Sequence, residues 1–196
     1  PGPQLALQMI QAFSCLDKKD GDRVNNLEKA KELFCEVMKV LLPQDYPLDW
    51  SSAQNGLGEA YRRLSLIRDR VSNIDKAIFH YKQALEFVTV QSYPDLWAAV
   101  HNNLGIAFAS GATGDQAKNI ENAIYHCDQA LKVYTREAFP NDWAMTQNNL
   151  GSAYNKRIQG ERIDNIDKAI FHSEQALQIQ ESQKDREEWA GTHNNL

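Results

Sequence analysis

The chain has 196 residues, 42% of them hydrophobic, and contains only 10 Gly and 6 Pro, a composition typical of a folded protein rather than a disordered tail. Lys and Arg number 21 against 26 for Asp and Glu, and the resulting net charge of −5 has the wrong sign for general binding to nucleic acid. No apolar run approaches the ~18 residues that span a bilayer, and the N-terminus lacks the basic start of a secretory signal. From these features we expect neither nucleic acid nor a membrane as a partner.

Three cysteines, Cys15, Cys35 and Cys127, form an odd set without a CxxC pair. This usage suits a reducing compartment better than a disulfide framework or a zinc site. The sequence therefore predicts a cytoplasmic protein without a bound metal.

A pattern with a fixed period begins weakly in residues 1–45, where "NLEKAKELFCEVM" starts at residue 26, and becomes regular downstream. The tryptophans mark it, because Trp50, Trp97, Trp143 and Trp189 are separated by 47, 46 and 46 residues. A period in this range predicts stacked structural units rather than one wrapped core. We divide the chain into a partial, degenerate repeat (1–45), three repeats (46–92, 93–138 and 139–185) and the start of a further repeat (186–196).

Each repeat contains two stretches with helical spacing, which we name the A helix and the B helix. In the first repeat, Trp50, Ala53, Leu57 and Tyr61 step by 3, 4 and 4 residues in the A helix. The B helix "NIDKAIFHYKQAL" has apolar residues at i, i+3, i+4 and i+7. Two amphipathic helices per repeat predict antiparallel helix pairs that pack through these stripes.

Prolines and acidic residues indicate where the helices begin. Pro47, Pro94 and Pro140 suit the first turn of an A helix, where a missing N–H costs little. Pairs resembling a capping box, such as Asn25 with Glu28 and Ser72 with Asp75, predict the starts of the B helices. Acidic residues between the A and B helices recur in phase, usually with Arg next to them, and suggest exposed ion pairs of little energetic weight. They are Asp22, Asp69, Asp115 and Glu161.

These motifs resemble the tetratricopeptide repeat over essentially the whole chain. Leu57-Gly58 followed by Tyr61, with its copies one and two periods later, matches the A-helix part, and Ala77, Tyr81 and Ala84 match the B-helix part. The resemblance implies an all-α, right-handed superhelical solenoid of antiparallel helix pairs. The period of 46 to 47 residues exceeds the family's 34, which implies longer helices. This long form is similar to bacterial arrays that stand beside caspase-like peptidase or signalling domains.

Two adjacent asparagines recur in the A helices although Asn is a poor helix former. The second of each pair, namely Asn103, Asn149 and Asn195, is expected on the face that lines the concave groove of such arrays. The resemblance to the repeats of kinesin light chains implies that this row holds a bound peptide, and a carboxamide can donate to and accept from a peptide backbone. Selectivity is assigned to neighbouring residues: Arg62, Arg63, Ile106, Met145 and Lys156.

The alternative is that the asparagines bond neighbouring helices and tie the stack together, because most recurrent residues of repeat proteins serve packing between units. We favour this inter-repeat role for the first Asn of each pair, Asn102 and Asn148. The tryptophans Trp50, Trp97 and Trp143 are assigned to the same packing.

No residue pattern predicts catalysis or a cofactor. His80, His126 and His172 recur one period apart on the B helices, but ligands of a zinc ion lie about 2 Å from one point, so residues in different repeats cannot share it. We interpret them as exposed or edge-packed histidines. Cys127 follows His126, yet i and i+1 side chains of a helix diverge, and a small buried residue is the simpler interpretation.

The sequence thus predicts a non-catalytic protein-interaction module that binds a peptide or partner protein in a concave groove. The alternative is a structural scaffold that associates head to tail with other copies through its unfinished terminal repeats.

Overall fold

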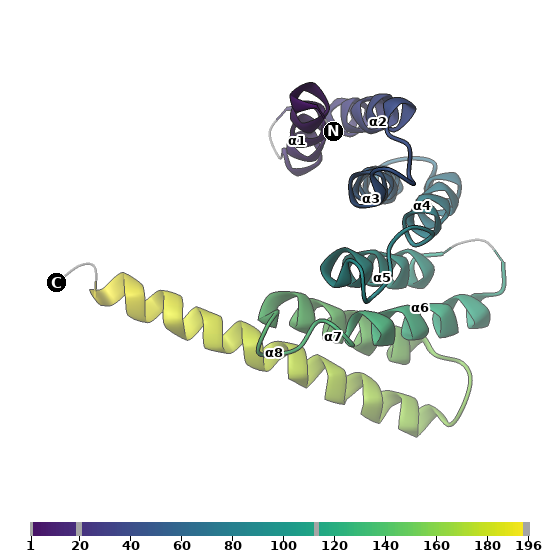
Figure 1. Ribbon diagram of the computed structural model, residues 1–196. Coiled ribbons are helices and arrows are strands. Elements are labelled where there is room, and N and C mark those ends of the chain that lie inside the picture. The colour runs from purple at the N-terminus through teal and green to yellow at the C-terminus, as the bar shows by residue number, and fades with distance from the viewer. Residues whose placement is uncertain (1, 19–20, 112–113, 194–196) are drawn as a thin grey trace.

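The computed structural model describes residues 2–18, 21–111 and 114–193, and of residues 180 and 182–193 it describes the backbone alone. The described residues form eight α-helices and no strand (Figure 1). The predicted all-α class is confirmed. None of the helices in these ranges is both long and apolar enough to cross a bilayer. The helices are α1 (Pro3–Asp17), α2 (Arg23–Val40), α3 (Pro47–Leu64), α4 (Arg70–Ala84), α5 (Pro94–Ala109), α6 (Gln116–Ala130), α7 (Pro140–Lys156) and α8 (Arg162–His193).

Consecutive helices pack as pairs, α1 with α2, α3 with α4, α5 with α6 and α7 with α8. Each pair also contacts the next, and the odd-numbered helices touch one another directly along the chain. In Figure 1 the odd-numbered helices follow one another along one side of the stack, and α2, α4 and α6 follow along the other. The molecule is therefore a two-layer stack of helix pairs, with the A helices α3, α5 and α7 in one layer.

The A helices begin at the three prolines, as the sequence predicts. The residue before each proline is aromatic and lies outside the helical region, with φ of −132° at Tyr46, −144° at Tyr93 and −135° at Phe139. Proline disfavours the helical region for the residue that precedes it, so the turn before each A helix is fixed locally. An acidic residue in each first turn, such as Asp49, complements the helix dipole.

The predicted starts of the B helices are wrong by about one turn. Ser72 is the third residue of α4 and Asn25 the third residue of α2, so neither is an N-cap. The caps of α2 and α6 are instead the recurring acids. The Asp22 carboxylate accepts from the N–H groups of Val24 and Asn25 at 3.0 and 3.2 Å, and Asp115 caps α6 in the same way. These two acids, expected in exposed ion pairs, thus act as N-caps.

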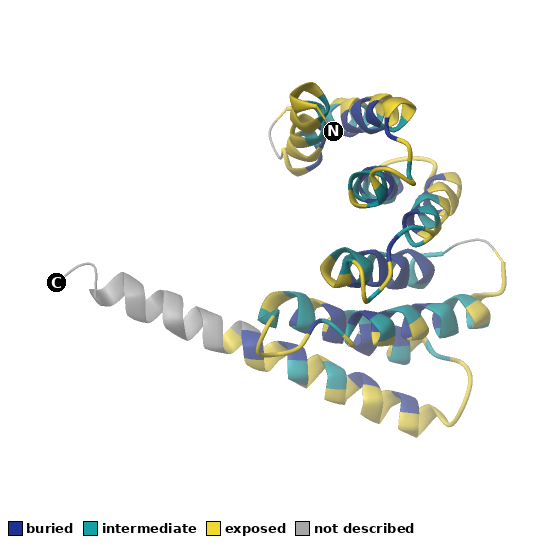
Figure 2. Ribbon diagram, in the orientation of Figure 1, coloured by how far each residue is buried: buried dark blue, intermediate teal, exposed yellow. Residues whose placement is uncertain are grey.

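The core lies between the layers, where the leucines of the Leu-Gly motif are buried (Figure 2). The glycine beside each leucine allows the A and B helices to approach closely. A Cβ at Gly58 would lie 2.6 Å from the Tyr81 ring, and one at Gly105 would lie 2.5 Å from the Cys127 sulfur. Cys127 is buried at the position of Tyr81 one repeat earlier, which confirms its interpretation as a small core residue.

The last helix differs from the sequence prediction. A turn was expected before residue 186, but α8 continues without a break from Arg162 to His193. The reason is local, because Asp185 and Arg186 stand where the earlier repeats have an aromatic residue followed by proline. Nothing at this point of the sequence forces the helix to end.

Candidate functional site

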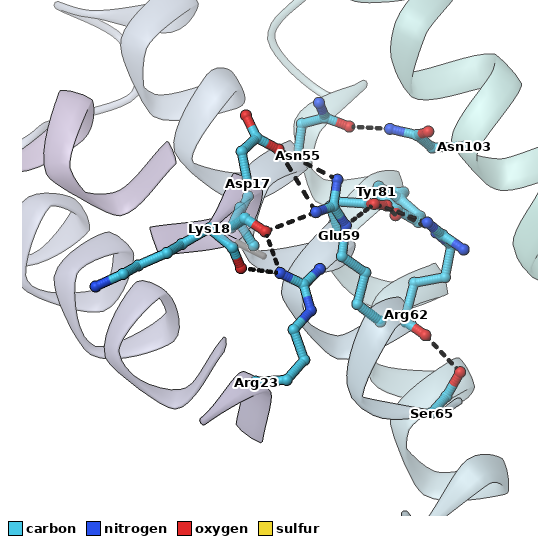
Figure 3. Close-up of polar contacts among 11 residues, drawn as sticks. Asp17, Lys18, Arg23, Asn55, Glu59, Arg62, Ser65, Tyr81 and Asn103 are labelled. Atoms are coloured by element: carbon cyan, nitrogen blue, oxygen red, sulfur yellow. Dashed lines mark hydrogen bonds and ion pairs between the residues drawn. The ribbon is translucent and has the colours of Figure 1, made fainter. Parts of the chain in front are cut away.

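Asparagines of successive A helices are joined by hydrogen bonds. The Nδ2 of Asn103 on α5 donates to Oδ1 of Asn55 on α3 at 3.0 Å (Figure 3), and the Nδ2 of Asn149 on α7 donates to Oδ1 of Asn102 on α5 at 3.0 Å. We call Asn55, Asn102, Asn103 and Asn149 the asparagine row. The row runs across three A helices in the direction in which the repeats stack.

The first asparagine of the α5 pair lies inside the interface between A helices. Asn102 is only 2% exposed, and its Oδ1 also accepts from the Thr146 hydroxyl at 3.1 Å. Asn148, its counterpart on α7, is exposed and faces a cavity beside α8. Asn195 lies outside the described residues.

The second asparagines, Asn103 and Asn149, also bond between helices, which is the arrangement expected under the alternative interpretation of the sequence. Both are only half-buried. A carboxamide has two N–H donors and an oxygen that can accept twice, and each bond uses one donor. With respect to the side chains that the structure describes, each of these two asparagines therefore keeps one N–H and its oxygen for another partner.

Glu59 on α3 gathers four polar contacts next to the row (Figure 3). Its carboxylate accepts from two nitrogens of Arg62, each at 2.7 Å, from the Tyr81 hydroxyl at 3.1 Å, and from Nε of Arg63. Burial opposes ionisation of Glu59, but the hydrogen bonds and positive charges of Arg62 and Arg63 outweigh it, so its pKa lies below the ordinary value. The carboxylate is ionised and pairs with both guanidinium groups, which leaves one net positive charge in the group.

Arg63 reaches from α3 to the C-terminus of α1, where it donates to the carbonyl oxygen of Leu16 at 2.7 Å. Arg23 donates to the same carbonyl at 2.8 Å and to that of Lys18 at 2.7 Å. Unpaired carbonyls at a helix end favour such cationic partners. The arginines that the sequence assigns to ligand selection, Arg62 and Arg63, are thus held by contacts within the protein.

The other residues assigned to selectivity lie beside the asparagine row. Met145 on α7 is exposed, and Ile106 on α5 is half-buried. The Lys156 ammonium lies 3.4 Å from the carbonyl oxygen of Ala109, which again links α7 to α5. Two of these side chains are apolar and the third is basic.

The tryptophans lie near the N-terminal ends of the A helices. Trp50 meets Phe87 edge to face with ring centroids 5.0 Å apart. Trp97 and Trp143 pack against one cluster that includes Tyr134 and draws on both repeats. These two tryptophans therefore lie at the contact between the second and third repeats.

The recurring histidines face a second position that recurs with the same period on the A helices and is occupied by Gln54, His101 and Gln147. His80 lies 2.8 Å from the Gln54 oxygen and His172 lies 2.6 Å from the Gln147 oxygen. In the middle repeat His126 faces His101 instead, with their Nδ1 atoms 2.9 Å apart. The shared period of the two positions is the signal that could have revealed these pairs.

One of the two facing histidines of the middle repeat donates its Nδ1–H to Nδ1 of the other. Burial lowers the pKa of each to about 4, and the positive charges of Lys132 near His101 and Lys82 near His126 act in the same direction. Both rings are neutral at pH 7. Across the described residues, no group of three or more His, Cys, Asp or Glu side chains is placed to hold a metal ion.

No family model matches this chain, and no curated protein is significantly similar to it. The resemblance to tetratricopeptide repeats therefore rests on the motifs and the helix pairing alone.

Proposed function

We propose that this chain is a non-catalytic protein-interaction module of the tetratricopeptide type. The A helices form the inner wall of a right-handed superhelical array and bind an extended peptide that crosses α3, α5 and α7. The observation that carries this proposal is the asparagine row, in which Asn103 and Asn149 are held by 3.0 Å bonds while each keeps a donor and an acceptor that no described side chain uses.

A side chain that is already held in place loses less conformational entropy when a ligand binds. Immobilising a free side chain costs about 0.5–1.5 kcal/mol, and this cost is reduced here. Two carboxamides held on neighbouring helices suit a peptide backbone, because its N–H and C=O groups recur regardless of sequence. Met145 and Ile106 would receive apolar side chains, and Lys156 an acidic one. The engaged Arg62 and Arg63 stabilise this wall and contribute less to selection.

The test is selection of linear twelve-residue peptides from a random library, followed by titration of one enriched peptide. Changing both Asn103 and Asn149 to Ala is expected to raise its Kd at least about tenfold, which corresponds to ~1.4 kcal/mol. Asn122→Ala is the matched control, because Asn122 is a half-buried asparagine on the B helix α6.

Failure to enrich any peptide would contradict the proposed function. An enriched peptide that binds the double variant with unchanged Kd, while the circular dichroism spectrum is preserved, would remove the asparagine row from the binding site.

A further inference from the structure

Among the side chains that the structure describes, none covers one face of the last helix pair. Residues of α7 and α8 line a cavity of about 450 Å³ there. We define the end face by six of them: Asn148, Ile166, Ala169, Ile170, Ser173 and Leu177. Figure 2 shows that much of the described part of α8 is exposed.

The same positions one repeat earlier are covered. Ile120 and Ile124 on α6 are 2% and 7% exposed, whereas their counterparts Ile166 and Ile170 on α8 are 38% and 51% exposed. The helix that packs on α6 is the next A helix, α7. The end face is thus the continuation of an interface that the chain already forms, but without its second helix.

The covering helix of the inner interface has a specific chemistry. Thr146 and Asn149 of α7 donate to the Oδ1 of Asn102, and Leu150 is buried in the same core cluster as Ile120. The sequence repeats these three residue types 46 positions later. They are Thr192, Asn195 and Leu196, which follow Trp189 as Thr146, Asn149 and Leu150 follow Trp143. Residues 186–196, the C-terminal segment, therefore carry the side chains that the end face accepts.

Two properties of this region decide whether the end face is covered by the C-terminal segment of the same chain or by that of a second copy. Apolar side chains of the end face gain from being covered, and the sequence before residue 186 lacks the aromatic-proline pair that ends the earlier connections. As a continuous helix, α8 extends past the end of α7 (Figure 1). To reach its own end face the segment would have to break α8, whereas a second copy can be reached without a break.

We propose that two copies of this chain exchange their C-terminal segments, so that residues 186–196 of each copy cover the end face of the other. Asn148 accepts from the partner's Thr192 and Asn195, as Asn102 accepts from α7. Helices α6 and α7 pack side by side across the short connection 131–139, so they run antiparallel. The two α8 helices therefore also run antiparallel, an arrangement that a two-fold axis perpendicular to them produces.

This exchange gives a closed dimer. It differs from head-to-tail association, which would continue into longer assemblies. It uses α7 and α8 at the end of the stack and does not depend on peptide binding by the A-helix surface.

The first experiment is light scattering with size-exclusion chromatography over a range of concentrations. The full chain is expected to have a mass near twice 22.3 kDa. Ile170→Asp places a charge at the covered face and is expected to weaken the dimer at least about 100-fold. Phe171→Asp is the matched control and is expected to leave the dimer intact, because Phe171 is similarly exposed, at 54%, but does not line the cavity.

A full chain that is monomeric at every concentration overturns the proposal. A dimer that survives Ile170→Asp as well as Phe171→Asp also overturns it, because the end face would then not be the interface.

The second experiment identifies the copy that supplies the segment and does not depend on the folding of the Ile170 variant. Asn148 and Asn195 are both changed to Cys in a chain whose Cys15, Cys35 and Cys127 are replaced by Ser, Ser and Ala, and the protein is oxidised. A disulfide requires the two Cα atoms to lie about 4.4–6.8 Å apart. A covalent dimer on a denaturing gel supports the exchange. A disulfide within a single chain, or no disulfide, overturns it.

Discussion

The asparagines of the row differ in their contribution to stability because they differ in burial. Asn102 is enclosed and accepts hydrogen bonds from two side chains of the next repeat, whereas Asn103 is half-buried and donates to the half-buried Asn55. A buried polar group that loses its partner pays the full cost of desolvation, while an exposed one is compensated by water. We therefore expect Asn102 to contribute mainly to stability, whereas Asn103 remains open to a ligand.

Asn102→Ala is expected to lower the free energy of unfolding by about 2–3 kcal/mol, because the buried Thr146 hydroxyl and the Asn149 amide both lose this acceptor. Asn103→Ala is expected to cost about 1 kcal/mol or less. Urea unfolding of both variants, followed by circular dichroism, measures the difference. Equal losses would show that burial does not distinguish the two positions.

The histidine pair of the middle repeat makes stability depend on pH. Native His101 and His126 have pKa values of about 4, below the ordinary 6.5, so the native state binds fewer protons than the unfolded state. Their contribution is present above pH 6.5 and is lost as the pH falls from 6.5 to about 4. Trp97 and Phe108 pack on the two rings, and Lys82 and Lys132 supply the nearby positive charges.

His101→Gln reproduces the Gln-His pairs that the chain already has at Gln54 with His80 and at Gln147 with His172. Between pH 7 and pH 5 this variant is expected to lose about 1–2 kcal/mol less stability than the original chain, since one depressed pKa is removed. The measurement is the urea midpoint at both pH values. An unchanged pH dependence would show that His101 is not protonated on unfolding.

At the scale of helices, the sequence predicts those features that depend on neighbouring residues in the chain. The A helices begin at Pro47, Pro94 and Pro140 because proline acts on its own turn and on the residue before it. The histidine pairs and the Glu59 contacts were not predicted, because they join residues that only the packing of different helices brings together. The spacing of Glu59 with Arg62 and Arg63 was nevertheless a visible signal for their ion pairs.

Close packing of the A and B helices in the middle repeat depends on Gly105 facing Cys127. Gly105→Ala would place a methyl group 2.5 Å from the Cys127 sulfur and 3.3 Å from the Ala123 carbonyl oxygen. Overpacking costs about 1–3 kcal/mol, which exceeds the gain of about 1 kcal/mol in helix propensity. We therefore expect Gly105→Ala to destabilise the protein.

The double variant with Gly105→Ala and Cys127→Ala removes the sulfur that the new methyl group would strike. Its loss of stability is expected to be smaller than the sum of the two single losses by about 1 kcal/mol or more. Thermal unfolding of the four proteins completes the cycle. Additive losses would mean that the clash is relieved elsewhere in the repeat.

At the scale of the whole molecule, neighbouring repeats are joined by polar contacts at the helix ends as well as by the core. Arg157 forms an ion pair with Glu121 at 2.7 Å, Arg68 pairs with Glu28, and Arg70 donates to the carbonyl oxygen of Ser110 at 3.2 Å. In a stack of this kind stability is approximately a sum over repeats and their shared interfaces. Covering the end face adds one more interface of the same type.

The connection before residue 186 decides how that last interface forms. Asp185→Phe with Arg186→Pro restores the aromatic-proline pair that precedes α7, and proline cannot continue α8 without loss of a hydrogen bond. The break is expected to let the C-terminal segment fold back onto its own end face, so that the exchanged dimer becomes a monomer. Light scattering and the disulfide between residues 148 and 195 measure this change, and the disulfide should move from between chains to within one chain. A double variant that remains a dimer would show that continuity of α8 is not what directs the segment to a second copy.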